Sequence, residues 1–166
     1  MRTKLLLSAI AVSMIFVAGI FVTAANAQTE NGHQSDTFVV RDTVTQLLGG
    51  RSIPGGDYIH LYDTTPYMIM NGHVAAKLPC DKSAKTPLQV LIGKAPDLKA
   101  ADMEYIKELS KPGQYCLYHV DLDSDETIVT DVAISNPTSK PVQFPTTSTV
   151  TVGINEIMPM EEESGH

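Results

Sequence analysis

Four side chains in this sequence offer soft metal ligands. Met68 and Met70 stand two residues apart, so they share one face of an extended strand, and His73 follows closely. His119 adds a second imidazole farther along the chain. Thioether sulfur combined with imidazole suits Cu(I), which makes these four residues candidate copper ligands. The alternative, favoured because methionine commonly fills core gaps, is that the methionines are packing residues.

A second group offers hard oxygen ligands. Asp121, Asp123 and Asp125 alternate along the chain, and Glu126 follows directly. This spacing resembles the first half of a calcium-binding loop, in which one turn supplies several oxygens. The four carboxylates are therefore candidate calcium ligands. The glycine and the distal glutamate of an EF-hand are missing, which favours the alternative of a solvated acidic turn.

Cys80 and Cys116 are the two cysteines of the chain. An even cysteine count in an exported protein predicts a disulfide. Closing this loop removes entropy from the unfolded chain and contributes about 3–4 kcal/mol of stability.

The run Tyr115-Cys116-Leu117-Tyr118-His119 resembles the copper loop of the cupredoxins. The resemblance implies electron transfer at a type-1 copper site, with His73, Cys116 and His119 as ligands. Three features oppose this reading: no axial methionine follows closely, strand alternation separates Cys116 from His119, and a disulfide would consume the thiolate.

No catalytic motif stands out. The sequence lacks Gly-x-Ser-x-Gly, His-Glu-x-x-His, a phosphate-binding glycine loop and Cys-x-x-Cys. His60 alternates with Tyr58 and Tyr62 on one predicted strand face and is interpreted as a packing residue. A binding role is therefore predicted in preference to an enzymatic one.

The N-terminus has the layout of an export signal. Arg2 and Lys4 precede an apolar stretch over residues 5–25, and Ala25-Asn26-Ala27 forms an A-x-A cleavage site. The stretch is also long enough to remain as an uncleaved anchor, in which case residues 5–25 contact the membrane. Both readings place the remaining chain outside the cytoplasmic membrane, secreted or anchored.

Charge narrows the choice of partners. Without residues 1–27 the chain keeps 10 basic and 19 acidic residues, a formal net charge of −9. Such a surface repels phosphate, so nucleic acid is excluded as a partner. An envelope or membrane protein is the predicted class of partner.

Short alternating runs between Gly, Pro and Asn turns predict antiparallel strands. They are expected at residues 37–48, 57–62, 67–70, 73–78, 88–93, 114–122, 127–135, 142–144 and 147–154. Asn71-Gly72 predicts a tight hairpin turn. The spacing of Leu98, Ala101, Tyr105 and Leu109 predicts one amphipathic helix over about residues 98–110.

Together these elements predict a mainly β fold: an antiparallel β-sandwich or barrel-like domain with one amphipathic helix and an N-terminal signal or anchor helix. The segments expected are a signal peptide or anchor (1–27), a flexible leader (28–36), the β-rich domain (37–157) and an acidic disordered tail (158–166).

The runs over residues 53–58 and 147–157 are similar to small exported proteins of ammonia-oxidising archaea. The resemblance implies no particular activity, but such organisms depend on copper, which supports the copper readings. The function predicted is an exported, disulfide-stapled binding or envelope-associated module of unknown ligand. The alternatives are a copper-binding or electron-transfer protein and a calcium-dependent adhesion or assembly protein.

Overall fold

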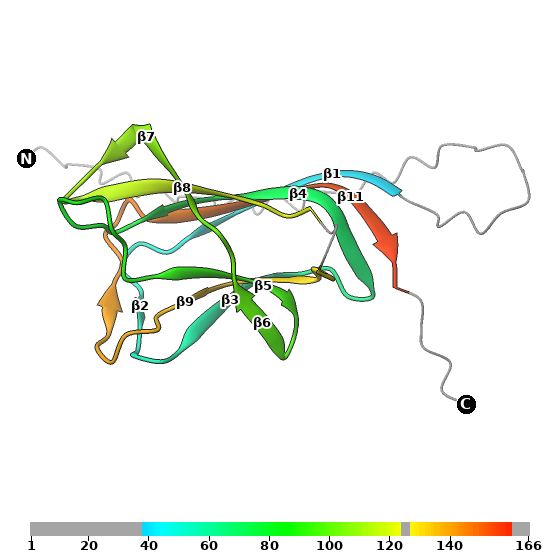
Figure 1. Ribbon diagram of the computed structural model, residues 1–166, viewed down its shortest axis with the longest axis horizontal. Helices are drawn as coiled ribbons and strands as arrows, with labels where there is room; N and C mark the ends of the chain where they lie inside the picture. Colours follow the sequence, from blue (N-terminus) through cyan, green and yellow to red (C-terminus); the bar gives the residue numbers. More distant parts are fainter. Residues whose placement is uncertain (1–37, 124–126, 161–166) are drawn as a thin grey trace, which may run out of the picture.

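The computed structural model describes residues 38–123 and 127–160 (Figure 1). The predicted signal or anchor and the leader lie outside these residues. So do Asp125 and Glu126 of the predicted calcium loop. Within the two described ranges, no helix is long and apolar enough to cross a membrane.

The described chain is built of antiparallel strands. They are β1 (Phe38–Leu47), β2 (Ser52–Ile53), β3 (Tyr58–Asp63), β4 (Tyr67–Leu78), β5 (Gln89–Lys94), β6 (Asp97–Ala100), β7 (Glu104–Lys111), β8 (Tyr115–Asp121), β9 (Asp131–Ser135), β10 (Val142–Gln143) and β11 (Thr149–Pro159). They form a five-stranded sheet in the order β1-β11-β4-β8-β7, a four-stranded sheet in the order β3-β9-β5-β6, and the pair β10-β2. The prediction of a mainly antiparallel β fold is confirmed.

The two larger sheets form two layers with the hydrophobic core between them (Figure 1). Alternate residues of each strand face inward, as the pleat of a strand requires. The inward set includes Val74, Ala76 and Leu78 of β4, Val150, Val152 and Ile154 of β11, and Val90, Val132 and Ile134 of the four-stranded sheet, all at most 1% exposed. Burying each valine, leucine or isoleucine side chain stabilises the fold by about 1.5–3 kcal/mol.

The predicted helix over residues 98–110 is wrong. Asp97–Ala100 pairs with β5 as strand β6, and Tyr105 and Ile106 of β7 pair with Tyr118 and Leu117 of β8. The helical spacing of apolar residues was coincidental, because Leu109 is 63% exposed. Pairing with β5 and β8 therefore outweighs the helical spacing of four apolar residues, which is a local signal.

The predicted hairpin turn at Asn71-Gly72 is also wrong, because β4 continues through both residues. The pairing of β4 with β11 shifts register here, which marks a bulge. A Cβ on Gly72 would lie 2.7 Å from the carbonyl oxygen of Gly153, and Asn155 Nδ2 donates to Asn71 Oδ1 at 2.7 Å. The dipeptide thus permits a close approach of two strands instead of reversing the chain.

The disulfide between Cys80 and Cys116 is present, with a Cα–Cα distance of 5.7 Å. Cys116 pairs in register with Leu78 and is fully buried, whereas Cys80 is half-buried in the loop after β4. The bond ties the end of β4 to the start of β8. A buried disulfide fits an oxidising environment outside the cytoplasm.

The predicted tail begins too early. Strand β11 continues through Pro159, and the Met160 amide donates to the carbonyl oxygen of Pro66 at 3.0 Å. Met158 therefore belongs to the five-stranded sheet. Residues 161–166 lie outside the described part of the chain.

Candidate functional site

A pocket of about 350 Å³ opens where the edge strands β1 and β3 meet. Its apolar walls come from Phe38 and Val40 of β1, Ile154 and Ile157 of β11, and Tyr67 at the start of β4. Phe38 and Tyr67 meet edge to face, with ring centroids 6.4 Å apart. Apolar walls with few polar groups are typical of small-molecule sites, and this volume is near the low end of their usual range of about 300–1,000 Å³.

Asp42 places a carboxylate in this pocket. In β1 the residues alternate between half-buried and exposed, and Asp42 shares the half-buried face with Phe38, Val40 and Val44. The Tyr62 hydroxyl donates a hydrogen bond to Asp42 Oδ2 at 2.8 Å and so links β3 to β1. Burial raises the pKa of Tyr62 to about 12, and the hydrogen bond and charge of Asp42 act in the same direction.

Tyr62 reaches the pocket because of a bulge in β3. The pairing with β9 shifts between His60 and Tyr62, so that His60 lies opposite Ala133 and Tyr62 lies opposite the core residue Val132. The extra residue moves Tyr62 to the inward face, where it packs against the core. The predicted common face of His60 and Tyr62 is therefore wrong.

A second carboxylate, Asp63, lines the pocket at the end of β3. Its Oδ1 accepts a hydrogen bond from the Thr65 amide at 2.8 Å. Hydrogen bonds from the Thr65 backbone and side chain lower the pKa of Asp63, and the nearby His60 adds to the effect. Among the described residues, the pocket lining thus has two carboxylates and no basic side chain.

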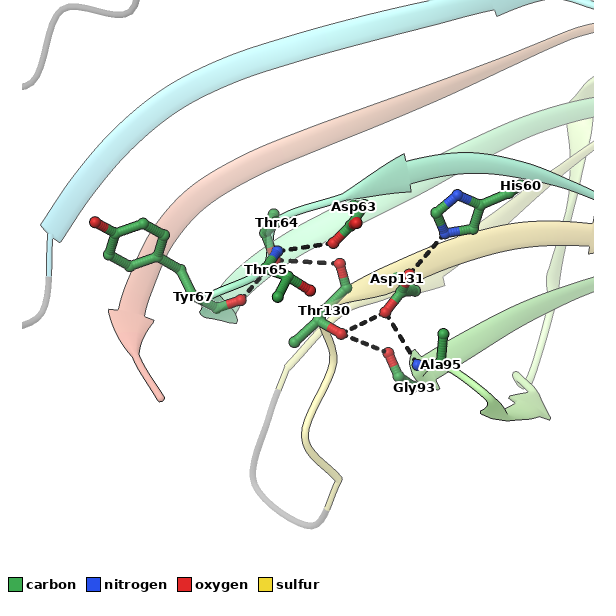
Figure 2. Close-up of polar contacts among 9 residues, drawn as sticks. All are labelled: His60, Asp63, Thr64, Thr65, Tyr67, Gly93, Ala95, Thr130 and Asp131. Carbon is green, nitrogen blue, oxygen red and sulfur yellow. Dashed lines mark hydrogen bonds and ion pairs between the residues drawn. The ribbon is translucent and has the colours of Figure 1, made fainter. Parts of the chain in front are cut away.

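Beside the pocket, His60 and Asp131 form the polar network of Figure 2. His60 Nε2 lies 2.7 Å from Asp131 Oδ1, and the Ala95 amide donates to Asp131 Oδ2 at 3.1 Å. The Thr130 hydroxyl donates to the same oxygen. Asp131 is 4% exposed, so these partners satisfy a buried carboxylate and hold the β5–β6 turn against β9.

This network does not form a catalytic triad. A triad needs a nucleophile on the second ring nitrogen of the histidine. In the described chain, Asp131 is the hydrogen-bond partner of the His60 ring, and Thr130 bonds to Asp131 instead. The geometry gives His60 and Asp131 a supporting role.

The four candidate copper ligands share one sheet face but not one site. Met68 pairs with Met158 of β11, and His73 lies five positions farther along β4, a span of roughly 16 Å at about 3.3 Å per residue. The His73 ring instead lies beside that of His119, with ring centroids 5.9 Å apart. The structure therefore separates Met68 from the two histidines.

The structure describes three of the other predicted ligands. Cys116 is disulfide-bonded and offers no thiolate to a type-1 copper site. Asp121 and Asp123 are exposed at the end of β8. Among residues 38–123 and 127–160, no group of three or more His, Cys, Asp or Glu side chains is placed to hold a metal ion.

Comparisons of this chain with protein-family models, curated proteins and solved structures find no match. The site must therefore be interpreted from its own geometry.

Sequence reasoning missed the hydrogen-bonded pair of the pocket, Asp42 and Tyr62. Asp42 could have been found, because a carboxylate on the apolar face of an alternating strand is a signal in itself. Tyr62 could not, because the bulge that turns it inward depends on the pairing of β3 with β9.

Proposed function

We propose that the protein is an exported β-sandwich binding module whose pocket between β1 and β3 takes a small amphiphilic cation, an apolar body carrying one protonated amine. The observation that carries the proposal is the lining of the pocket, which combines apolar walls with the carboxylates of Asp42 and Asp63.

Charge complementarity selects the ligand class. A carboxylate beside apolar walls is best compensated by a cation that brings its own hydrogen-bond donors. Tyr62 bonds to Oδ2 of Asp42 and, within the described residues, no hydrogen bond is made to Oδ1, which can accept one from a bound ammonium group. Phe38 and Tyr67 supply ring surface, which also attracts cations.

The rest of the chain is consistent with a module that works outside the cytoplasm. The N-terminal sequence has the layout of an export signal. The disulfide fits an oxidising compartment. The acidic surface favours cationic ligands over phosphate-bearing ones.

Calorimetric titration of the purified protein tests the proposal with three probes of equal chain length: n-octylamine, octanol and octanoate. The amine is expected to bind most tightly, and octanoate is expected not to bind. Asp42→Asn should weaken octylamine binding about tenfold or more, because a charge-assisted hydrogen bond is lost, while octanol binding stays unchanged.

Asp102→Asn is the matched control, since Asp102 is an exposed carboxylate outside the pocket. It should leave octylamine binding unchanged. Equal affinity for octanol and octylamine, or an Asp42→Asn variant that binds the amine as well as the wild type, would refute the proposal.

A further inference from the structure

Two imidazoles stand together on the outer face of the five-stranded sheet, away from the pocket. His73 of β4 pairs with Asp121 of β8, and His119 of β8 pairs with Ala75 of β4, so the two histidines occupy diagonal positions on neighbouring strands. Their ring centroids lie 5.9 Å apart, with planes inclined by 23°. Because the strand register sets this arrangement, the rings are positioned by the sheet itself.

The strand on the other side of β4 fixes the His73 ring. Gly153 of β11 lies opposite His73, and a Cβ at residue 153 would overlap the imidazole. The ring therefore lies across the glycine backbone. Glycine at this register position gives His73 its place beside His119.

Carboxylates flank the pair. His119 Nδ1 lies 3.8 Å from Asp121 Oδ1, and Glu104 of β7 is the cross-strand partner of His119. Negative charge next to two imidazoles favours a bound cation, and a carboxylate near a ligating histidine orients its ring. The His119 side chain is 34% exposed, so an ion can reach it from solvent.

We propose that His73 and His119 form a two-imidazole chelate for Cu(II), a site independent of the pocket. With a metal–nitrogen bond of about 2.0–2.1 Å, the centres of two imidazoles on one ion lie within roughly 6.5 Å of each other. The observed 5.9 Å falls inside this limit. Cu(II) binds nitrogen donors most tightly among the first-row divalent ions, and solvent completes its tetragonal coordination.

This chelate differs from the methionine and histidine set predicted for Cu(I). Its two ligands come from adjacent strands, and imidazole nitrogen replaces thioether sulfur as the donor. The nearby Met68–Met158 pair contributes nothing to it, because Met68 lies five residues from His73 along β4.

The test is equilibrium dialysis of the purified protein against Cu(II) buffered with glycine, which suppresses binding by single side chains. His73→Gln and His119→Gln should each lower the Cu(II) affinity at least tenfold. The double variant should lose little more than either single one, because one imidazole alone cannot chelate. Pulsed electron paramagnetic resonance of the wild type should show coupling to two imidazoles.

His60→Gln is the control, since it removes an imidazole from the other sheet. It should keep the wild-type affinity, and circular dichroism verifies that each variant retains its β-sheet content. A double variant that binds Cu(II) as tightly as the wild type overturns the proposal. So does a wild-type spectrum with coupling to one imidazole, a result that needs no variant.

Discussion

The two ends of the layered sheets are held together in different ways. At one end, the disulfide anchors the loop after β4, and the fully buried Asn136 anchors the segments that follow β2 and β9. The Asn136 amide donates to the carbonyl oxygens of Lys140, Ile53 and Pro54 at 2.7, 3.0 and 3.2 Å. Where β1 meets β3, the link is the Tyr62–Asp42 hydrogen bond beside the pocket.

The polar groups at the two ends differ in whether they can also bind a ligand. A buried amide whose partners all lie within the protein can only hold the structure together. A half-buried carboxylate with a spare acceptor can also bind a ligand. Changes at the first end should therefore alter stability without altering binding, whereas changes at the second end should alter binding and cost less stability.

The largest effect is expected from the double variant Cys80→Ala/Cys116→Ala. Opening a loop with a sequence separation of 36 should lower the free energy of unfolding by about 3–4 kcal/mol, measured by denaturant titration. The reduced wild type should show a similar loss. An unchanged octylamine affinity in the folded variant would support the separation of stability from binding. A loss of less than about 1 kcal/mol in the free energy of unfolding would contradict the anchoring role of the disulfide.

Asn136→Ala should come next. It removes three hydrogen bonds from the Asn136 amide to backbone carbonyl oxygens, which should lower the free energy of chemical unfolding by about 2–3 kcal/mol. The carbonyl oxygens of Pro54 and Lys140 keep the Asp57 amide and the Thr138 hydroxyl as donors. Asn155→Ala is the matched control, because it removes an exposed amide bonded to Asn71 and should change stability by less than about 0.5 kcal/mol. Equal effects in the two variants would contradict the supporting role of Asn136.

Tyr62→Phe should have the smallest effect at neutral pH, a loss of about 1 kcal/mol for one hydrogen bond. At high pH the variant becomes informative. The folded-state pKa of Tyr62 is about 12 against an ordinary value of 10.0. Between these values the native state holds a proton that the unfolded state releases, so wild-type stability falls as pH rises.

Between about pH 9 and 12, a window set by the two pKa values, the free energy of unfolding should therefore decline less steeply in Tyr62→Phe than in the wild type. Tyr58→Phe serves as the control, because Tyr58 is 54% exposed and should retain the wild-type slope. Parallel pH profiles for the wild type and Tyr62→Phe would show that Tyr62 is not held protonated by its surroundings.

Most of the strands were predictable from sequence because alternation and turn residues are local signals. The run from residue 37 to 48 corresponds to β1, and the run from 114 to 122 corresponds to β8. The disulfide was predictable because only Cys80 and Cys116 could pair. These features depend on composition and near neighbours, which the sequence displays directly.

The failures have a common physical cause in strand pairing. Asn71-Gly72 favours a turn locally, but β11 pairs with both residues and the Leu122 amide donates to the carbonyl oxygen of Gly72. Leu98 to Leu109 carries a helical period, but β5 and β8 supply partners that make it strand. For the same reason, the pocket could be anticipated at Asp42 and not at Tyr62.

The asymmetric burial of the disulfide has a kinetic consequence. A thiol reductant from solvent meets the half-buried Cys80 first, and its attack must expel the Cys116 thiolate into the fully buried core. An anion is poorly stabilised there, so Cys116 is a slow leaving group. The disulfide should therefore resist mild reductants for as long as β4 and β8 stay paired. Its reduction should then be limited by the rate of global unfolding.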